Sequence, residues 1–189
     1  SNLRNKIRKA QRHVHVTCSD NAMPMYGLTR KTFERQGLGV PLDRQLFSRM
    51  DHALAEHRAR NIFYAVDDES RVHSGLYLIW DSESAYVHLV GEDPALRSSG
   101  AGILLVWEAI KYTSQELGID TFDFEGSMIE SVEQVRRDFG AMQMPYFAIS
   151  KSNWKHSLLS AASSGARSLG RAARKSRMPA QYDHITLDA

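Results

Sequence analysis

The chain has 189 residues, of which 42% are apolar and 24% are charged, and its formal net charge is +2. This length and composition fit one globular domain, or one domain with an appendage, and argue against a disordered chain. No apolar run approaches the roughly 20 residues of a membrane-spanning helix. The single cysteine, Cys18, excludes an internal disulfide framework and a cysteine-rich zinc site. We therefore expect a soluble protein of a reducing compartment, the cytoplasm.

Charge is distributed unevenly along the chain. Residues 1–12 carry five basic and no acidic side chains, for +5, and residues 151–178 carry seven basic and no acidic ones, for +7. The intervening residues 13–150 carry 12 basic and 20 acidic side chains, for −8. Two basic arms around an acidic centre indicate that an anionic partner would meet the ends of the chain.

Apolar periodicity predicts the order of helices and strands. Three helix patterns come first, at residues 3–14, 25–36 and 41–60. Three strand patterns joined by short polar turns follow, at 61–66, 72–80 and 85–90. The last patterns are a helix, a strand, a helix and a strand, at 102–117, 121–124, 127–139 and 144–150. This order predicts a mixed α/β (α+β) fold with a mostly antiparallel sheet, flanked by helices and containing one parallel crossover.

The most informative motif lies between the third strand and the next helix. It reads Arg97-Ser98-Ser99-Gly100-Ala101-Gly102, in the pattern Arg-x-x-Gly-x-Gly. Two glycines let the backbone approach a ligand closely, and a helix start presents unpaired N–H groups and the positive end of its dipole. Arg97 adds a charge-assisted contact. The motif predicts a phosphate or pyrophosphate site, and its plainer interpretation is a glycine-containing turn into a helix.

This motif and its position resemble the coenzyme A pyrophosphate loop of the GNAT acyltransferases, which has the form Gln/Arg-x-x-Gly-x-Gly/Ala. Further stretches are similar to the FemAB-like branch of that family, which includes methicillin-resistance-type proteins. They are Tyr26-x-Leu28 with Thr32-x-x-Arg35-x-Gly37 and Pro41, Leu104–Ile110 with Phe122-Asp123-Phe124-x-Gly126-Ser127, and Val135-Arg136-Arg137-Asp138-Phe139-Gly140. Together they cover residues 3–150.

The resemblance implies a division of the chain into three parts. A basic junction segment occupies 1–20, a GNAT-like acyltransferase domain occupies 21–150, and a basic helix with a loose tail occupies 151–189. FemAB-like proteins usually carry two GNAT-like halves, so the chain corresponds to the second half. A second GNAT-like lobe or a second copy of the chain is therefore an expected partner.

The resemblance also implies where chemistry would occur. GNAT members place the acyl group where two parallel strands separate, here 85–90 and 121–124, and backbone N–H groups near Leu89 and Val90 would face the acyl oxygen. Amine acylation needs a base. The acidic candidates beside this point are Glu92, Asp93, Asp123 and Glu125.

We prefer Glu125 as the base. Strand alternation would place it with Asp123 on the face opposite Phe122 and Phe124, where an apolar wall raises the pKa of a carboxyl group. Glu92 and Asp93 also fit ordinary turn acids, and Asp123 also fits a structural role within the sheet.

Two further residues are candidates. Tyr146 fits either the acid that protonates the leaving thiolate or a core-lining tyrosine. Arg136 replaces a lysine that faces the reaction centre in FemAB-like proteins, and its planar, essentially non-titrating head suits anion binding but not proton transfer. The eight histidines show no metal-ligand spacing with partners apart from His52 and Glu56, which fit a solvated helix face, so we expect no metal.

We expect an N-acyltransferase that uses acetyl-CoA or another acyl-CoA. Its acceptor would be an amine of a small molecule, a sugar or a cell-envelope precursor. One alternative is a FemAB-type transferase that takes aminoacyl groups from tRNA, whose phosphates the basic arms would contact. Another is a non-catalytic GNAT-like binding module. The pyrophosphate loop favours coenzyme A, because a tRNA donor does not require it.

Overall fold

The computed structural model describes residues 2–40, 42–126 and 130–145. Its elements in chain order are α1 (Asn2–Ala10), β1 (His15–Cys18), α2 (Met23–Arg35), α3 (Arg44–Glu56), β2 (Arg60–Val66), β3 (Val72–Trp80), β4 (Ser84–Glu92), a 3-10 turn (Arg97–Ser99), α4 (Ala101–Tyr112), a π-helical turn (Thr113–Leu117), β5 (Thr121–Asp123) and α5 (Glu130–Asp138). None of the helices within these ranges is long and apolar enough to cross a membrane.

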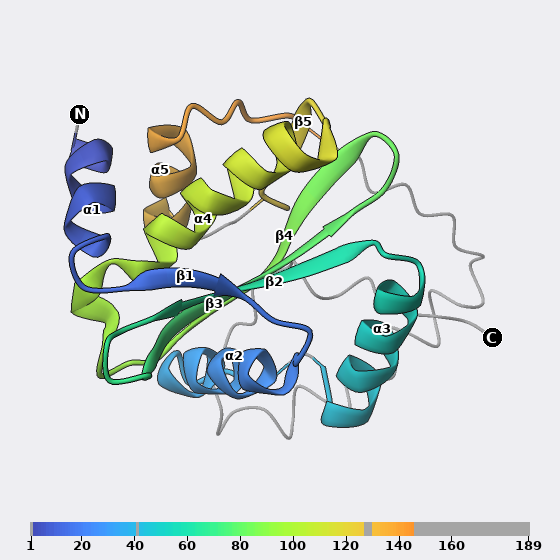
Figure 1. The fold of residues 1–189 in the computed structure, drawn as a ribbon, viewed down its shortest axis with the longest axis horizontal. Helices are drawn as coiled ribbons and strands as arrows, with labels where there is room; N and C mark the ends of the chain where they lie inside the picture. Colours follow the sequence, from blue (N-terminus) through green and yellow to red (C-terminus); the bar gives the residue numbers. More distant parts are fainter. Residues whose placement is uncertain (1, 41, 127–129, 146–189) are drawn as a thin grey trace, which may run out of the picture.

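One sheet carries the strands in the order β1-β2-β3-β4-β5 (Figure 1). The first four strands pair antiparallel, and β5 pairs parallel with β4 after the crossover through α4. The predicted mixed, mostly antiparallel α/β fold is therefore confirmed, including the parallel crossover.

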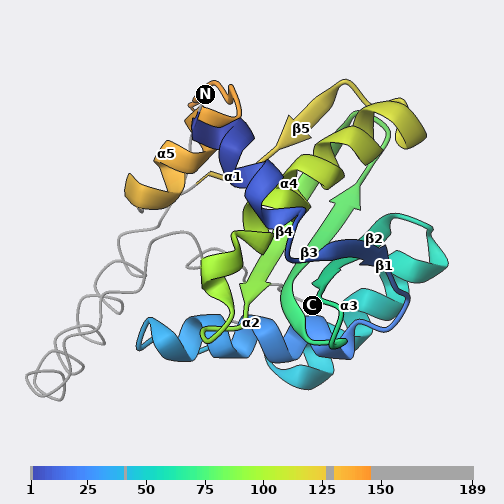
Figure 2. The same cartoon turned by 60° about the vertical axis from the view of Figure 1, so that its left-hand side comes forward.

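Helices cover both faces of the sheet. Helices α2 and α3 lie against one face, while α1, α4 and α5 lie on the other (Figures 1 and 2). Each face has its own apolar core. Met25 and Phe47 are fully buried in the core under α2 and α3, and Leu76 and Leu105 are fully buried in the core under α1 and α4.

A β-bulge in β4 changes which side chains face each core. Tyr77 pairs with Leu89 and Leu78 pairs with Val87, so His88 has no partner on β3. As a result Val87 packs in the α4 core, whereas Leu89 packs in the α2 core. The extra residue thus reverses the alternation of β4 just where the strand approaches the predicted pyrophosphate motif, Arg97–Gly102.

Strands β4 and β5 stay together only briefly. Their pairing runs from Ser84 with Thr121 to Tyr86 with Asp123, while β4 continues to Glu92. The two parallel strands therefore separate after Tyr86, as expected from the GNAT resemblance.

Several element boundaries differ from the predictions. Helix α3 begins after Asp43, whose carboxylate accepts the N–H of Leu46 at 2.8 Å. It ends at Glu56, before the predicted residue 60, and Arg58 then adopts the left-handed conformation with φ +52. Strand β1 was not predicted, because it is a short edge strand whose residues are mostly exposed and show no alternation. Helix α4 gives way to a π-helical turn at Thr113, and β5 ends at Asp123, one residue early.

The last predicted elements fall partly or wholly outside the description. Residues 127–129, where the helix now seen as α5 was expected to begin, lie outside the described residues. So do residues 146–150 of the expected final strand, and the described Met144 and Pro145 are not in a strand. The basic segment 151–189 also lies outside them.

Candidate acyl-transfer site

The predicted pyrophosphate motif forms one compact turn into α4. Arg97–Ser99 make a 3-10 turn, and Gly100 follows in the left-handed conformation with φ +73, which favours glycine. Gly102 lies close to the Glu92 side chain, since a Cβ atom there would lie 2.8 Å from Oε1 of Glu92 and the carboxylate would have to move. Ser98 and Gly102 are each the second residue of a helical element, where a backbone N–H group has no acceptor within its own helix. The turn therefore offers such N–H groups at the start of a helix, as a pyrophosphate site needs.

Side chains from two other elements reach this turn. The Glu92 carboxylate at the end of β4 lies 3.0 Å from Nε of Arg97, and both groups are partly exposed. Lys9 of α1 donates to the carbonyl oxygen of Ser98 at 3.4 Å. The basic N-terminal segment thus lies beside the loop, which the sequence pattern did not reveal.

Asp93 is occupied by an ion pair. Its carboxylate lies 2.6 Å from Nζ of Lys31 on α2, and this contact holds the pKa of Asp93 below its usual value. Its other carboxylate oxygen accepts the N–H of Ala95 at 2.9 Å. These contacts give Asp93 a structural role at the end of β4, in agreement with the turn-acid interpretation.

A second cluster lies where β4 and β5 separate. Oε1 of Glu125 lies 3.2 Å from Nδ1 of His88, the bulge residue of β4. The premise that strand alternation places Asp123 and Glu125 on one face is wrong, because β5 ends at Asp123 and Glu125 has φ +55. Instead the Asp123 carboxylate accepts the N–H of Glu125 at 2.7 Å and shapes the turn.

His88 was not singled out from the sequence. A carboxylate only accepts, so the proton of the contact with Glu125 lies on Nδ1. Nε2 is buried, and it has no hydrogen-bond partner within the described ranges. The sequence offered one signal for His88, its place in the strand expected beside residues 121–124. The bulge that turns its side chain toward Glu125 could not be predicted, because it depends on the pairing of β4 with β3.

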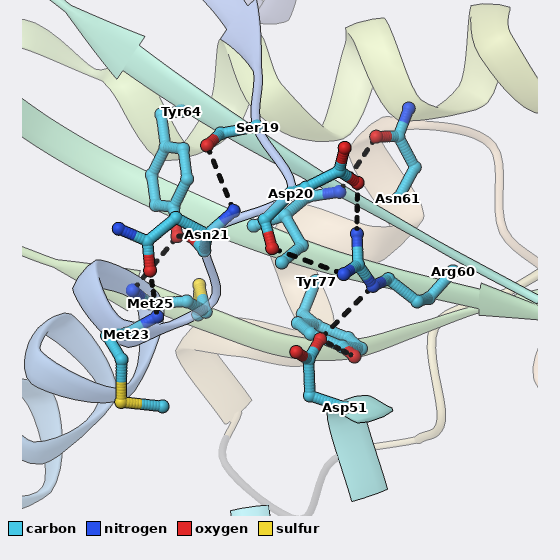
Figure 3. A network of polar contacts seen from close by, with 11 residues as sticks. Ser19, Asp20, Asn21, Met23, Met25, Asp51, Arg60, Asn61, Tyr64 and Tyr77 are labelled. Atoms are coloured by element: carbon cyan, nitrogen blue, oxygen red, sulfur yellow. Dashed lines mark hydrogen bonds and ion pairs between the residues drawn. The ribbon is translucent and has the colours of Figure 1, made fainter. Parts of the chain in front are cut away.

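A polar network joins Arg60 and Tyr77 of the sheet to Asp20 and Asp51 (Figure 3). Arg60 of β2 lies between Asp20 and Asp51, at 2.9 and 3.1 Å, and Tyr77 donates to Asp51 at 2.7 Å. Burial is the main cause that raises the pKa of Tyr77, with a further contribution from Asp51. Because the Tyr77 ring meets the His88 ring edge-on at 6.4 Å, the network holds one wall of the His88 site.

The other site residues predicted from the sequence lie around the point where β4 and β5 separate or fall outside the described residues. The guanidinium carbon of Arg136 on α5 lies over the ring of Phe124, 6.0 Å from its centroid. Phe124 directly precedes Glu125 in the sequence. Leu89 is buried and Val90 is 37% exposed, both just beyond the bulge. Tyr146 lies outside the described residues. Among the described residues, no three His, Cys, Asp or Glu side chains are grouped to hold a metal ion.

A sequence model of the acetyltransferase (GNAT) domain matches residues 1–131, more than half of the chain. The chain belongs to the GNAT acetyltransferase family. Membership of this family confirms the predicted class of enzyme, an acyltransferase. None of the curated proteins matches the chain.

Solved structures agree with the GNAT fold. The crystal structure of FemX superposes with a TM-score of 0.64 at 15% identity, over 74% of this chain and 53% of FemX. The aminoglycoside 6'-N-acetyltransferases AAC(6')-Ih of Acinetobacter baumannii and AAC(6')-IG of Acinetobacter haemolyticus give TM-scores of 0.55 and 0.54, at 13% and 12% identity. Each of these two matches covers 74% of this chain and 98% of the other. The chain thus spans about half the length of FemX and nearly all of the aminoglycoside enzymes.

Proposed function

We propose that this GNAT domain transfers an acetyl group from acetyl-CoA to a primary amine of a small molecule or cell-envelope precursor. The observation that carries the proposal is the turn at Arg97–Gly102, where the first N–H groups of two successive helical elements and a half-exposed arginine meet at the start of α4. Such a turn suits a pyrophosphate, which coenzyme A carries.

The residues present fit coenzyme A. The N–H groups of Ser98 and Gly102 and the guanidinium of Arg97 would bind the pyrophosphate, with Ser99, Gly100 and Ala101 setting the turn. Bound acetyl-CoA would supply an activated thioester. The β4 edge near Leu89 and Val90 runs on after β5 has parted from it, so its backbone would bind the acyl oxygen.

Glu125 would act as the base that removes a proton from the acceptor ammonium. Its contact with Nδ1 of His88 restricts the carboxylate, so His88 would position the base. Asp123 would hold the backbone turn that presents it. Arg136 would bind an anionic part of the acceptor, and Tyr146 would protonate the leaving thiolate.

An aminoacyl-tRNA donor is the second candidate, favoured by the position of α1. The basic helix lies beside the loop, with Lys9 on Ser98, so phosphates of an RNA would meet cations there. In that case tRNA, and not acetyl-CoA, would bind to the chain. A non-catalytic module would bind coenzyme A without transferring an acyl group.

The test is thiol release from acetyl-CoA in the presence of a panel of amines, including aminoglycosides, amino sugars and lysine-containing peptides. We expect turnover with at least one amine. Glu125→Gln should lower kcat by about 100-fold or more, the usual contribution of a general base, without changing the Kd of coenzyme A. Glu83→Gln, in the exposed β3–β4 turn, is the matched control. A Glu125→Gln variant with the kcat of Glu83→Gln would exclude Glu125 as the base.

A further inference from the structure

A chain of buried polar side chains connects the β2–β3 turn with the pyrophosphate loop. Oδ2 of Asp67 lies 2.9 Å from Nε2 of His73, and Nδ1 of His73 lies 3.0 Å from Oγ of Ser99. Each of the three residues is 7% exposed. Because Ser99 ends the 3-10 turn of the loop, these hydrogen bonds fix the loop to β3 from below its surface.

Asp67 is held as a carboxylate at the far end of the chain. Its Oδ1 accepts the N–H groups of Glu69 and Arg71 at 3.1 and 2.9 Å, and its Oδ2 also accepts Nε of Arg71 at 2.7 Å. The hydrogen bond from His73 is the largest cause that lowers the pKa of Asp67 well below its usual range, and the Arg71 contacts add to it. Nε2 of His73 therefore carries a proton that it donates to Asp67.

The hydrogen bonds of Ser99, at the other end of this row of side chains, depend on how many protons His73 carries. Oγ of Ser99 lies 2.9 Å from the carbonyl oxygen of Leu96, and it accepts the N–H of Ala101 at 3.3 Å. One hydroxyl proton serves either Leu96 or Nδ1 of His73, not both. When Nδ1 is protonated, the ring donates to Ser99 and the hydroxyl donates to Leu96, so every contact is satisfied. When Nδ1 is deprotonated, the hydroxyl must turn to the ring and leave Leu96.

We propose that Asp67 and His73 are positioning residues for the pyrophosphate loop, and that the Nδ1 proton of His73 selects the direction of the Ser99 hydroxyl. The doubly protonated ring holds the 3-10 turn through Leu96 and adds positive charge behind the loop. The affinity for coenzyme A should then decrease as His73 loses its Nδ1 proton. This inference rests on the proposed function, because it takes the loop to be the coenzyme A site.

Other charged groups surround His73, and their effects on binding must be distinguished from the effect of His73. The three side chains line a cleft of about 600 Å³ that opens between α1, the β2–β3 turn and the loop. The charged and titratable groups around His73 come from three places. They are Lys9 of α1 with Arg12 and His13 just after it, Asp67, Asp68, Glu69 and Arg71 of the β2–β3 turn, and Asp93 after β4 with Lys31 of α2. His13 is the other histidine among these groups, so it is the control for His73.

The first test is calorimetric titration of the full chain with coenzyme A between about pH 5.5 and 8.5, the range over which histidines change charge. Wild-type affinity should fall as the pH rises, by about tenfold or more, the usual effect of losing a hydrogen bond to a charged group. His73→Gln and Ser99→Ala should bind more weakly at pH 6 and lose most of this dependence. His13→Gln should keep the wild-type slope. Titration of the ligand phosphates is common to all four proteins, so only the differences between them report on the protein.

The second test does not need the ligand. In the chain labelled with ¹⁵N-histidine, both ring nitrogens of His73 should be protonated at acid pH, and Ser99→Ala should shift the Nδ1 resonance more than the Nε2 resonance. Circular dichroism establishes that each variant is folded, and Ser99→Ala is the smaller change should His73→Gln unfold. Failure of the wild type to bind coenzyme A at any pH would overturn the proposed function but leave the spectroscopic result valid. An unchanged Nδ1 resonance in Ser99→Ala, or a wild-type pH slope in His73→Gln, would overturn the inference.

Discussion

The carboxylate of Glu92 lies 3.0 Å from Nε of Arg97 and joins the end of β4 to the first residue of the proposed pyrophosphate loop. The Arg97 side chain is 47% exposed, so the pair contributes at most about 1 kcal/mol to stability. Its effect is on geometry, because the Glu92 carboxylate that holds the guanidinium also lies beside Gly102 at the start of α4. Glu92 was a candidate base by sequence, and this contact supports a role in orienting Arg97 instead.

Replacing Arg97 should weaken the binding of coenzyme A. Loss of a charge-assisted hydrogen bond costs about 1.5–3 kcal/mol, so Arg97→Ala should raise the Kd by about 10- to 100-fold with little change in Tm. Calorimetric titration measures this. Arg30→Ala, which removes another exposed arginine from an ion pair on α2, should bind like the wild type. Equal affinities in the two variants would argue against the loop as the binding site.

Replacing Glu92 separates its two candidate roles. If it orients Arg97, Glu92→Gln should change the KM for acetyl-CoA more than kcat, since the guanidinium loses its partner but the base is retained. Steady-state kinetics with the amine found by the thiol-release assay provide the measurement. A fall in kcat of about 100-fold, the size expected for loss of a general base, would instead indicate that Glu92 is the base.

The crossing of α2 over β4 should be intolerant of side-chain atoms. A Cβ atom at Gly91 would lie 2.7 Å from the backbone of Leu28 and Thr29, so Gly91→Ala should destabilise the fold by about 1–3 kcal/mol. Gly27 on the same helix has open space around it, and Gly27→Ala should stabilise by up to about 1 kcal/mol. Urea unfolding compares the two. Equal stabilities would contradict this packing.

Stability should depend on pH through Asp67. Its contacts with His73 and Arg71 lower its pKa in the folded chain, so the contribution is present above the unfolded value of about 3.9 and is lost as the pH falls toward the folded value. Asp67→Asn should therefore lower Tm at pH 7, and its difference from the wild type should shrink below about pH 4. Asp68→Asn removes an exposed carboxylate from the same turn and is the control. A Tm difference that stays constant from pH 7 to 3 would contradict the assignment.

The sequence predicted what depends on local pattern. The turn from Arg97 to Gly102 is specified by its own glycines and by the helix that follows, so its position was found without the rest of the fold. Strands β2, β3 and β4 and helix α4 followed from apolar periodicity in the same way. Strand β1 was missed because an exposed edge strand needs no alternation, and its pairing with β2 is a tertiary contact.

The parts that were missed depend on contacts between distant residues. The His88 bulge is a property of the register between β3 and β4, and no feature of the β4 sequence specifies it. Glu125 was selected on a premise about strand alternation that is wrong, yet the turn at Asp123 brings it to His88. The contact between His73 and Ser99 joins residues 26 positions apart, across the β3–β4 hairpin and the loop.

The most direct test of the account is the Tm of the full chain with acetyl-CoA, measured beside the same chain with tRNA. A ligand at 100 times its Kd adds about 2.7 kcal/mol of stability, which raises Tm by several degrees for a domain of this size. We predict that acetyl-CoA raises Tm, that Arg97→Ala needs a higher concentration for the same shift, and that tRNA has no effect. A shift with tRNA and none with acetyl-CoA would contradict the assignment of coenzyme A to this loop.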